Sequence, residues 1–177
     1  MTSDEDSVLL AEARAGSRLA LSRLIDRHQQ AVRAFLRRVA VDREDADDLA
    51  QETFVTAWSQ LEAWRGQSTV RAWLLGIAWR KSRSAGRTLM RRMARDRAWT
   101  EAEALAPRMA GTPEDRLTLD KAMMSLNVQQ RAAVALCLAE DYSHAEAAEI
   151  LGLPLGTVKS QVLRGRARLL EVLEDRP

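Results

Sequence analysis

The feature that most constrains the fold is an amphipathic pattern that begins at Asp45. Apolar residues recur there at steps of three and four, at Ala46, Ala50, Phe54, Ala57, Trp58 and Leu61. This is the period of an α-helix with one buried face. The opposite face carries a compact polar patch made of Asp47, Asp48, Gln51 and Glu52. The stretch therefore predicts a helix that turns acidic side chains toward solvent or a partner.

A polar break at residues 64–69 separates this helix from a second one that becomes strongly basic. The break reads Trp64-Arg65-Gly66-Gln67-Ser68-Thr69 and is typical of a loop. The apolar positions of the second helix are Trp73, Leu74, Ile77 and Ala78. Its cations are Arg71, Arg80, Lys81, Arg83 and Arg87. Acidic and basic helices so close in sequence favour one module with two partners of opposite charge. The plainer alternative is a solvated acidic face with the tryptophans in the core.

Composition describes a folded protein whose charges are segregated. Of 177 residues, 46% are hydrophobic and 29% are charged, which is ordinary for a globular chain. The net charge is only +2, yet residues 42–52 are acidic and residues 80–97 are mostly basic. The single cysteine, Cys137, excludes an intrachain disulfide and fits a reducing compartment. No apolar run approaches the roughly 20 residues that span a bilayer, so we expect a cytoplasmic protein without membrane insertion.

The N-terminal residues predict two more helices within residues 7–40, divided at Gly16-Ser17. Asp42 is a candidate N-cap for the acidic helix. His28 lies among apolar positions without a second ligand nearby, so we interpret it as a packed or surface histidine and expect no metal site. Residues 1–90 are therefore predicted to form one helical domain. The pattern weakens over residues 91–112, which we interpret as a flexible linker with a helical extension to about Glu103.

Residues 113–177 predict a second helical domain that ends in a helix-turn-helix. Ser143 and Glu146 have the spacing of a capping box, and Gly152 permits a sharp turn. Thr157 caps or opens the next helix, which carries the cations Lys159, Arg164, Arg166 and Arg168. The second helix of such a motif enters the DNA major groove. An ordinary helical hairpin with a solvated basic face is the alternative. The expected fold class is all-α, with two small helical domains joined by a flexible linker.

The stretch with DLAQETF resembles region two of bacterial RNA polymerase sigma factors, and it is most similar to the extracytoplasmic-function (ECF) group. The resemblance implies that Asp48, Gln51 and Glu52 bind core RNA polymerase. It also implies that the loop and the basic helix hold the melted −10 promoter strand. The residues expected there are Trp64, Arg65, Ser68, Arg80, Lys81 and Arg83. Trp64 is the best candidate to stack on a base.

The segment GTVKSQVLRGRARL resembles sigma region four, which reads the −35 element. The resemblance implies DNA contacts by Thr157, Lys159, Ser160, Leu163, Arg164 and Arg168.

Four positions depart from the usual family pattern in ways that bear on binding or stability. Arg80 and Ser84 replace the usual Asn and Asp of the basic helix, and both changes favour phosphate binding over base readout. In region four, Gln161 replaces Arg and Gly165 replaces Ala. A further departure puts Asn127 where the family has Pro.

Together the two resemblances imply an alternative sigma factor that binds core polymerase and promoter DNA and promotes melting. An anti-sigma factor is a further expected partner. We expect no enzymatic activity and no cofactor, because the sequence has no catalytic triad, paired-acid pocket, Gly-rich phosphate loop or Cys/His cluster. Two alternatives stay open. One is a LuxR-like helix-turn-helix regulator, and the other is a sigma mimic that sequesters an anti-sigma factor.

Overall fold

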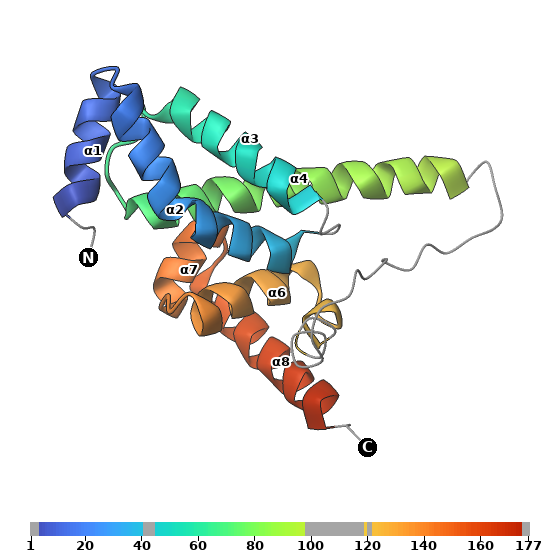
Figure 1. Cartoon of the computed structure of the whole chain (residues 1–177). Coiled ribbons are helices and arrows are strands. Elements are labelled where there is room, and N and C mark those ends of the chain that lie inside the picture. The colour runs from blue at the N-terminus through green and yellow to red at the C-terminus, as the bar shows by residue number, and fades with distance from the viewer. Residues whose placement is uncertain (1–3, 41–44, 98–118, 120–121, 175–177) are drawn as a thin grey trace.

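The computed structural model describes residues 4–40, 45–97, 119 and 122–174, and within them every regular element is a helix. The first half contains α1 (Asp4–Arg14), α2 (Arg18–Val39), α3 (Asp45–Gln60) and α4 (Val70–Arg97). The second half contains α6 (Val128–Val134), a π-helical turn (Ala135–Ala139), α7 (His144–Leu151) and α8 (Leu155–Glu174). Figure 1 shows these two groups stacked against each other. The predicted all-α fold class is confirmed.

In the first half α2 is the central helix, and α1, α3 and α4 all pack against it. Its buried stripe includes Leu24, Val32, Phe35, Leu36 and Val39, as the helical period requires. The predicted break before α2 is confirmed by its caps. Gly16 adopts φ +93° after α1, and the Ser17 hydroxyl accepts a hydrogen bond from the Ala20 N–H at 3.2 Å.

The helix α4 is long and extends away from the rest of the first half (Figure 1). Residues 91–97 of the expected linker are helical, in line with the expected extension of the helix. The remaining linker residues lie outside the described part of the chain, as do Asp42 and the start of the second domain at residue 113. Among the described helices, none is both long and apolar enough to span a bilayer.

The second half has the caps that its sequence predicted. The Ser143 hydroxyl accepts from the Glu146 N–H at 3.2 Å, and the Glu146 carboxylate accepts from the Ser143 N–H at 2.9 Å. Gly152 takes the left-handed conformation at φ +62° and turns the chain toward α8. The expectation that Thr157 caps or opens α8 is wrong, because the helix already begins at Leu155, two residues earlier. Asn127, a departure from the family pattern, forms a capping box with Gln130 at the start of α6.

Gly165 allows α8 to cross α6 at close range. A methyl group built on Gly165 would lie 2.7 Å from Cγ2 of Val134, which is closer than nonbonded carbon atoms approach. A helical glycine costs about 1 kcal/mol relative to alanine. The close crossing explains why a glycine stands in this buried position of α8.

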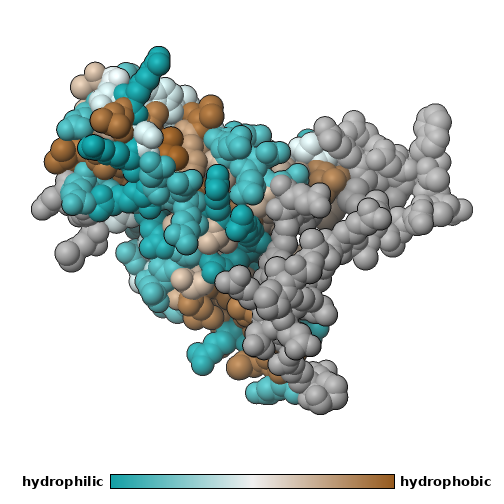
Figure 2. All heavy atoms as spheres, in the orientation of Figure 1, coloured by the Kyte–Doolittle hydropathy of each residue, from teal (hydrophilic) through white to brown (hydrophobic). Residues whose placement is uncertain are grey.

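The two halves share one hydrophobic core, which the expectation of two linked domains did not include. Apolar residues of α2, α4, α6 and α7 form one continuous buried cluster. At its centre Trp79 of α4 is 1% exposed, and its indole N–H donates to the Leu151 carbonyl at 3.1 Å. On the face turned to the viewer in Figure 2, the middle of the molecule is mostly hydrophilic.

Candidate functional site

The acidic face of α3 is exposed as the sequence predicted. Asp48, Gln51 and Glu52 all lie at the surface, while Ala46, Ala50 and Ala57 on the opposite side are buried. Glu52 accepts a hydrogen bond from Lys81 of α4 at 3.2 Å. Among the described residues, Asp48 has no ion-pair partner within 4.0 Å. A carboxylate of this kind is available to a basic partner at little desolvation cost.

The apolar stripe predicted for α3 needs one correction. Trp58 was expected with the buried residues, but it is 42% exposed. Thr53, which was not expected on the buried face, is fully buried, and its hydroxyl donates to the Leu49 carbonyl at 2.7 Å. Val55 is also exposed, one helical turn after Gln51 and Glu52. The acidic face therefore continues into an apolar strip along the same helix.

Side chains of α1 and α4 contact the loop between α3 and α4 and fix its position. The ring of Trp64 stacks on Trp73 with centroids 5.3 Å apart and an interplanar angle of 29°. Arg14 lies over the same ring at 5.7 Å and donates to the carbonyls of Leu61 and Trp64. Trp64 was expected to be available for base stacking, but these contacts already occupy much of its surface. No local pattern in the sequence indicated Arg14, which lies 50 residues before Trp64.

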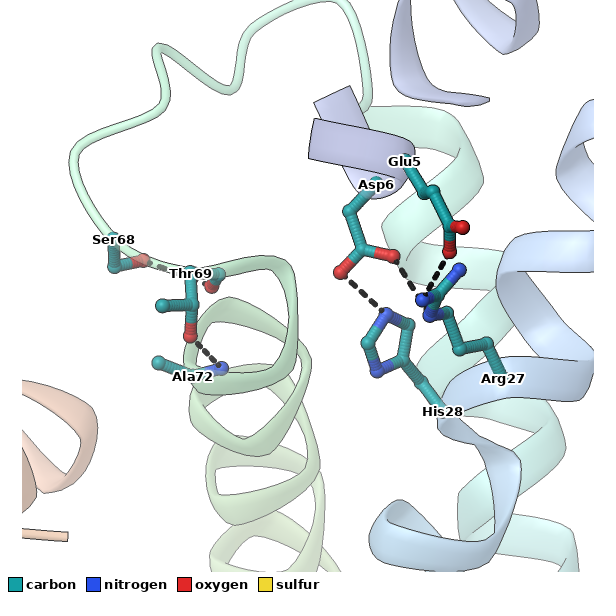
Figure 3. Close-up of polar contacts among 7 residues, drawn as sticks. All are labelled: Glu5, Asp6, Arg27, His28, Ser68, Thr69 and Ala72. Atoms are coloured by element: carbon teal, nitrogen blue, oxygen red, sulfur yellow. Dashed lines mark hydrogen bonds and ion pairs between the residues drawn. The ribbon is translucent and has the colours of Figure 1, made fainter. Parts of the chain in front are cut away.

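At the end of the loop, Ser68 and Thr69 come directly before α4 (Figure 3). The Thr69 hydroxyl accepts from the Ala72 N–H at 3.1 Å, which is the geometry of an N-cap. The Ser68 hydroxyl donates to the Thr69 carbonyl at 3.4 Å, a long and weak contact. Arg65 and Gln67 are exposed. The loop therefore presents polar side chains from a backbone that its own caps and Arg14 hold in place.

The six residues expected to hold the −10 strand do not all line one hollow of the described surface. Ser68 and Arg80 line the same groove between α4 and α7. Trp64 and Arg65 line a separate recess with Arg14 and Glu62. Lys81 is turned toward Glu52, and the Arg83 guanidinium lies 5.6 Å from the centre of the Trp79 ring. Ser68 of the loop and Arg80 of α4 therefore line one groove, although 12 residues separate them in the sequence.

The groove between the halves has a volume of about 400 Å³. The first half contributes Gln67, Ser68, Thr69 and Arg80, among other residues. The second half contributes Tyr142, Glu146, Glu149 and Ile150. Two carboxylates of α7 therefore face the same groove as a cation of the basic helix. The sequence did not predict this juxtaposition, because it depends on how the halves pack.

The helix α8, the second helix of the expected helix-turn-helix, presents exposed cations and exposed leucines. Lys159, Arg164 and Arg168 are exposed, and Leu163 is 71% exposed although it is apolar. Arg164 donates to the Ser160 carbonyl at 3.2 Å and to its hydroxyl at 3.1 Å. Arg168 is paired with Glu171 at 3.0 Å. Ser160 and Thr157 are half-buried beneath this face.

His28 packs within the first half. Its Nε2 lies 3.1 Å from Oδ2 of Asp6, and Arg27 pairs with Asp6 and Glu5 (Figure 3). Burial lowers the pKa of His28, although the Asp6 carboxylate opposes this shift. These contacts fasten α1 to α2. Within the described residues no group of three or more His, Cys, Asp or Glu side chains could hold a metal ion.

Comparisons with known proteins match both halves. The family model for sigma-70 region 2 matches residues 24–100, and the model for sigma-70 region 4 matches residues 116–169. The ECF RNA polymerase sigma factor SigM of Mycobacterium tuberculosis is 34% identical over 173 residues, covering 95% of this chain and 84% of SigM. The RNA polymerase sigma factor NccH of Alcaligenes xylosoxydans xylosoxydans is 32% identical over 177 residues, covering 96% of this chain and 95% of NccH.

A solved structure extends the likeness to three dimensions. The sigma factor RpoE of Bartonella quintana, crystallised with the anti-sigma factor NepR, matches with a TM-score of 0.69 and 32% identity. The match covers 88% of this chain and 98% of the RpoE chain. The likeness therefore spans both helical halves.

Proposed function

The chain belongs to the ECF group of RNA polymerase sigma factors, and on that premise we propose that it directs core RNA polymerase to a set of promoters. It binds the enzyme, reads the −35 and −10 elements and promotes strand separation. The observation that carries this proposal is that both family regions occur in the family's order, each with its expected polar face at the surface. Proteins of this family are DNA-binding regulators of transcription rather than enzymes.

The polymerase-binding surface in this proposal is the acidic face of α3. Asp48, Gln51 and Glu52 are exposed and lie within two turns of one helix. Their charge suits a basic surface on the enzyme. The adjoining Val55 is exposed as well and would add apolar contact area at the same interface.

The −10 strand is held by the loop and the basic helix. Arg65, Arg80 and Arg83 are exposed cations that can bind phosphates, and Ser68 shares a groove with Arg80. Lys81 becomes available when its exposed contact with Glu52 breaks, because such surface pairs contribute at most about 1 kcal/mol. Trp64 stacks on a base only if it leaves Trp73 or uses the remaining part of its ring.

The −35 element is read by α8, which enters the major groove. Lys159, Leu163 and Arg164 supply exposed side chains for base edges and phosphates, and Arg168 adds a phosphate contact. Thr157 and Ser160 lie half-buried at the start of the same helix and support its approach to the backbone. An exposed leucine beside arginine suits contact with a thymine methyl group.

An anti-sigma factor is the partner that restrains the protein in this proposal. The RpoE chain that this protein resembles was solved in complex with the anti-sigma factor NepR. Since the proposed partner enzyme is in the cytoplasm, the protein would act there. The LuxR-like alternative loses its support, because its N-terminal half would be a domain of strands and helices, whereas residues 24–100 match sigma region 2.

The deciding experiment is transcription with purified core polymerase on a pool of fragments from the organism's own genome. A sigma factor yields discrete 5′ ends that share −35 and −10 sequences and vanish when the protein is left out. A mimic binds an anti-sigma factor and gives no such transcripts. The Asp48→Arg, Glu52→Arg double variant serves as a control for transcripts that arise without docking.

A further inference from the structure

We propose that the free protein closes on itself, with α7 of region four covering part of the −10 surface of region two. The proposal rests on the proposed role of Ser68 and Arg80 in holding the −10 strand. In this closed form the −35 helix stays available while the −10 groove is shielded. The protein must open before it can trap a melted strand.

The seam between the halves is packed like a protein core. Trp79 is fully buried there and donates to the Leu151 carbonyl at 3.1 Å. Beside it, Gly76 brings the backbone of α4 close to α7, since a methyl group built on Gly76 would lie 3.5 Å from the Ile150 carbonyl oxygen. Leu75, Leu136 and Ile150 are buried in the same cluster. Burial of this apolar surface favours the closed form.

An ionic contact anchors the same seam at its edge. Glu140, which follows the π-helical turn, has a side chain only 6% exposed. It accepts hydrogen bonds from Arg38 of α2 at 2.9 Å and from Arg71 of α4. Both arginines are partly exposed already, and separation of the halves would expose the Glu140 carboxylate to water as well. The anchor is therefore suited to reversible closure.

The face that closure covers is the one proposed to bind DNA. Glu146 and Glu149 of α7 line the groove opposite Ser68 and Arg80. A carboxylate and a phosphate both attract arginine, so α7 occupies the side from which an anionic strand would approach. Its two carboxylates also repel such a strand. On α8, by contrast, Lys159, Leu163 and Arg164 stay exposed.

The first test removes the two carboxylates without changing the shape of α7. Glu146→Gln keeps the capping box with Ser143, and Glu149→Gln replaces an exposed side chain by its amide. The probe is a fluorescein-labelled, randomised single-stranded 12-mer, titrated by anisotropy at low salt against the full chain. The double variant should bind roughly three- to tenfold more tightly than the original protein, because the local repulsion is removed.

The matched control is Glu171→Gln with Glu174→Gln, which removes the same charge from the exposed end of α8. This control should change the affinity much less. An equal gain in both double variants would mean that only net charge matters, and the closed-form proposal would fail. No gain in either would also overturn it.

The second test holds the molecule closed. In a Cys137→Ser background, Gln67→Cys and Glu149→Cys put thiols on opposite sides of the groove, where a reducible bifunctional reagent can join them. The cross-linked protein should bind the 12-mer more weakly than the same sample after reduction. Equal binding before and after reduction would contradict occlusion.

Arg80→Ala separates failure of this inference from failure of the proposed −10 role. If Arg80→Ala weakens binding by the reduced protein while cross-linking has no effect, the −10 role stands and closure is refuted. If Arg80→Ala leaves the affinity of the reduced protein unchanged, Arg80 does not hold the strand. In that case both the proposed −10 role of Arg80 and the proposed shielding by α7 are refuted.

Discussion

At the scale of single residues, Gly165 sets how closely two helices of region four approach. Its missing side chain leaves room for Val134, whereas Gly156, in the first turn of the same helix, has open space around it. Valine is branched at Cβ, so it cannot move aside by a small change of rotamer. The two glycines therefore differ in their neighbours while sharing one helix.

We expect Gly165→Ala to lower the free energy of unfolding by about 1–3 kcal/mol, because the added methyl overpacks the crossing. Gly156→Ala is the matched control and should raise it by roughly 0.5–1 kcal/mol through backbone entropy. Urea unfolding followed by circular dichroism measures both. Val134→Ala combined with Gly165→Ala should recover part of the loss. A stabilising Gly165→Ala would show that the crossing relaxes freely.

A second prediction at this scale distinguishes two arginines of α8. Arg164 lies beside Ser160 at the exposed face, whereas Arg168 is paired with Glu171 near the end of the helix. A hydrogen bond from Arg164 to a base edge would contribute about 1–3 kcal/mol of discrimination. Arg164→Ala should therefore relax preference at one −35 position, while Arg168→Ala weakens all sequences alike. A promoter library that reports identical profiles for both variants would exclude base reading by Arg164.

At the scale of elements, α3 has one face that holds the bundle and another that is free for a partner. Asp47 lies 3.6 Å from both Arg33 and Arg37 of α2, which ties the start of α3 to the central helix. Asp48 is on the exposed side, and the contact of Glu52 with Lys81 is solvent-exposed. Changes at Asp48 and Glu52 should therefore affect binding more than folding.

Asp48→Arg with Glu52→Arg should abolish capture of core polymerase while the circular dichroism spectrum keeps its helical signal. The reason is charge reversal on an exposed face that suits a basic partner. Glu171→Arg with Glu174→Arg makes the same change in net charge on α8 and should leave capture intact. If the α3 variant is captured as well as the original protein, the docking surface lies elsewhere.

Local signals in the sequence predicted the elements well, and long-range packing explains what was missed. The helix caps at Ser17 and Ser143 and the turn at Gly152 involve only residues a few positions away. The sequence could therefore predict them. The stack of Trp64 on Trp73 with Arg14 depends on residues far apart in the chain, and periodicity carries no information on it. The same holds for Trp58, whose exposed position depends on how α3 rotates against its neighbours.

At the scale of the whole molecule, the two helical domains that the sequence predicted pack together into one body. Contacts of α4 with α7 and of α2 with α6 join them. The residues of α3 that the sequence predicted to be exposed are exposed in the structure. Of the six residues expected at the −10 strand, Ser68 and Arg80 line a groove, Trp64 and Arg65 line a recess, and the other two line neither. Only the packing of the halves reveals that Glu146 and Glu149 face Arg80.

Trp64→Ala tests the whole molecule on promoter DNA. It should slow open-complex formation, seen as lower permanganate reactivity of unpaired thymines, while closed complexes still form through α8. Trp73→Ala is the companion variant, because it removes the stacking partner of Trp64 but not the ring proposed to meet a base. A loss confined to Trp64→Ala supports base stacking. Equal losses would assign both rings to holding the loop, and full reactivity in both would remove the loop from melting.

The burial of Trp79 also gives the molecule a built-in optical probe. Its indole lies in an apolar seam and donates to a carbonyl, with an arginine over the ring. Transfer of that ring into water moves tryptophan fluorescence to longer wavelength and opens it to quenching by iodide. The difference between the emission of the original protein and that of Trp79→Phe isolates this one fluorophore. Stopped-flow mixing with polymerase can then time the separation of the halves without any attached dye.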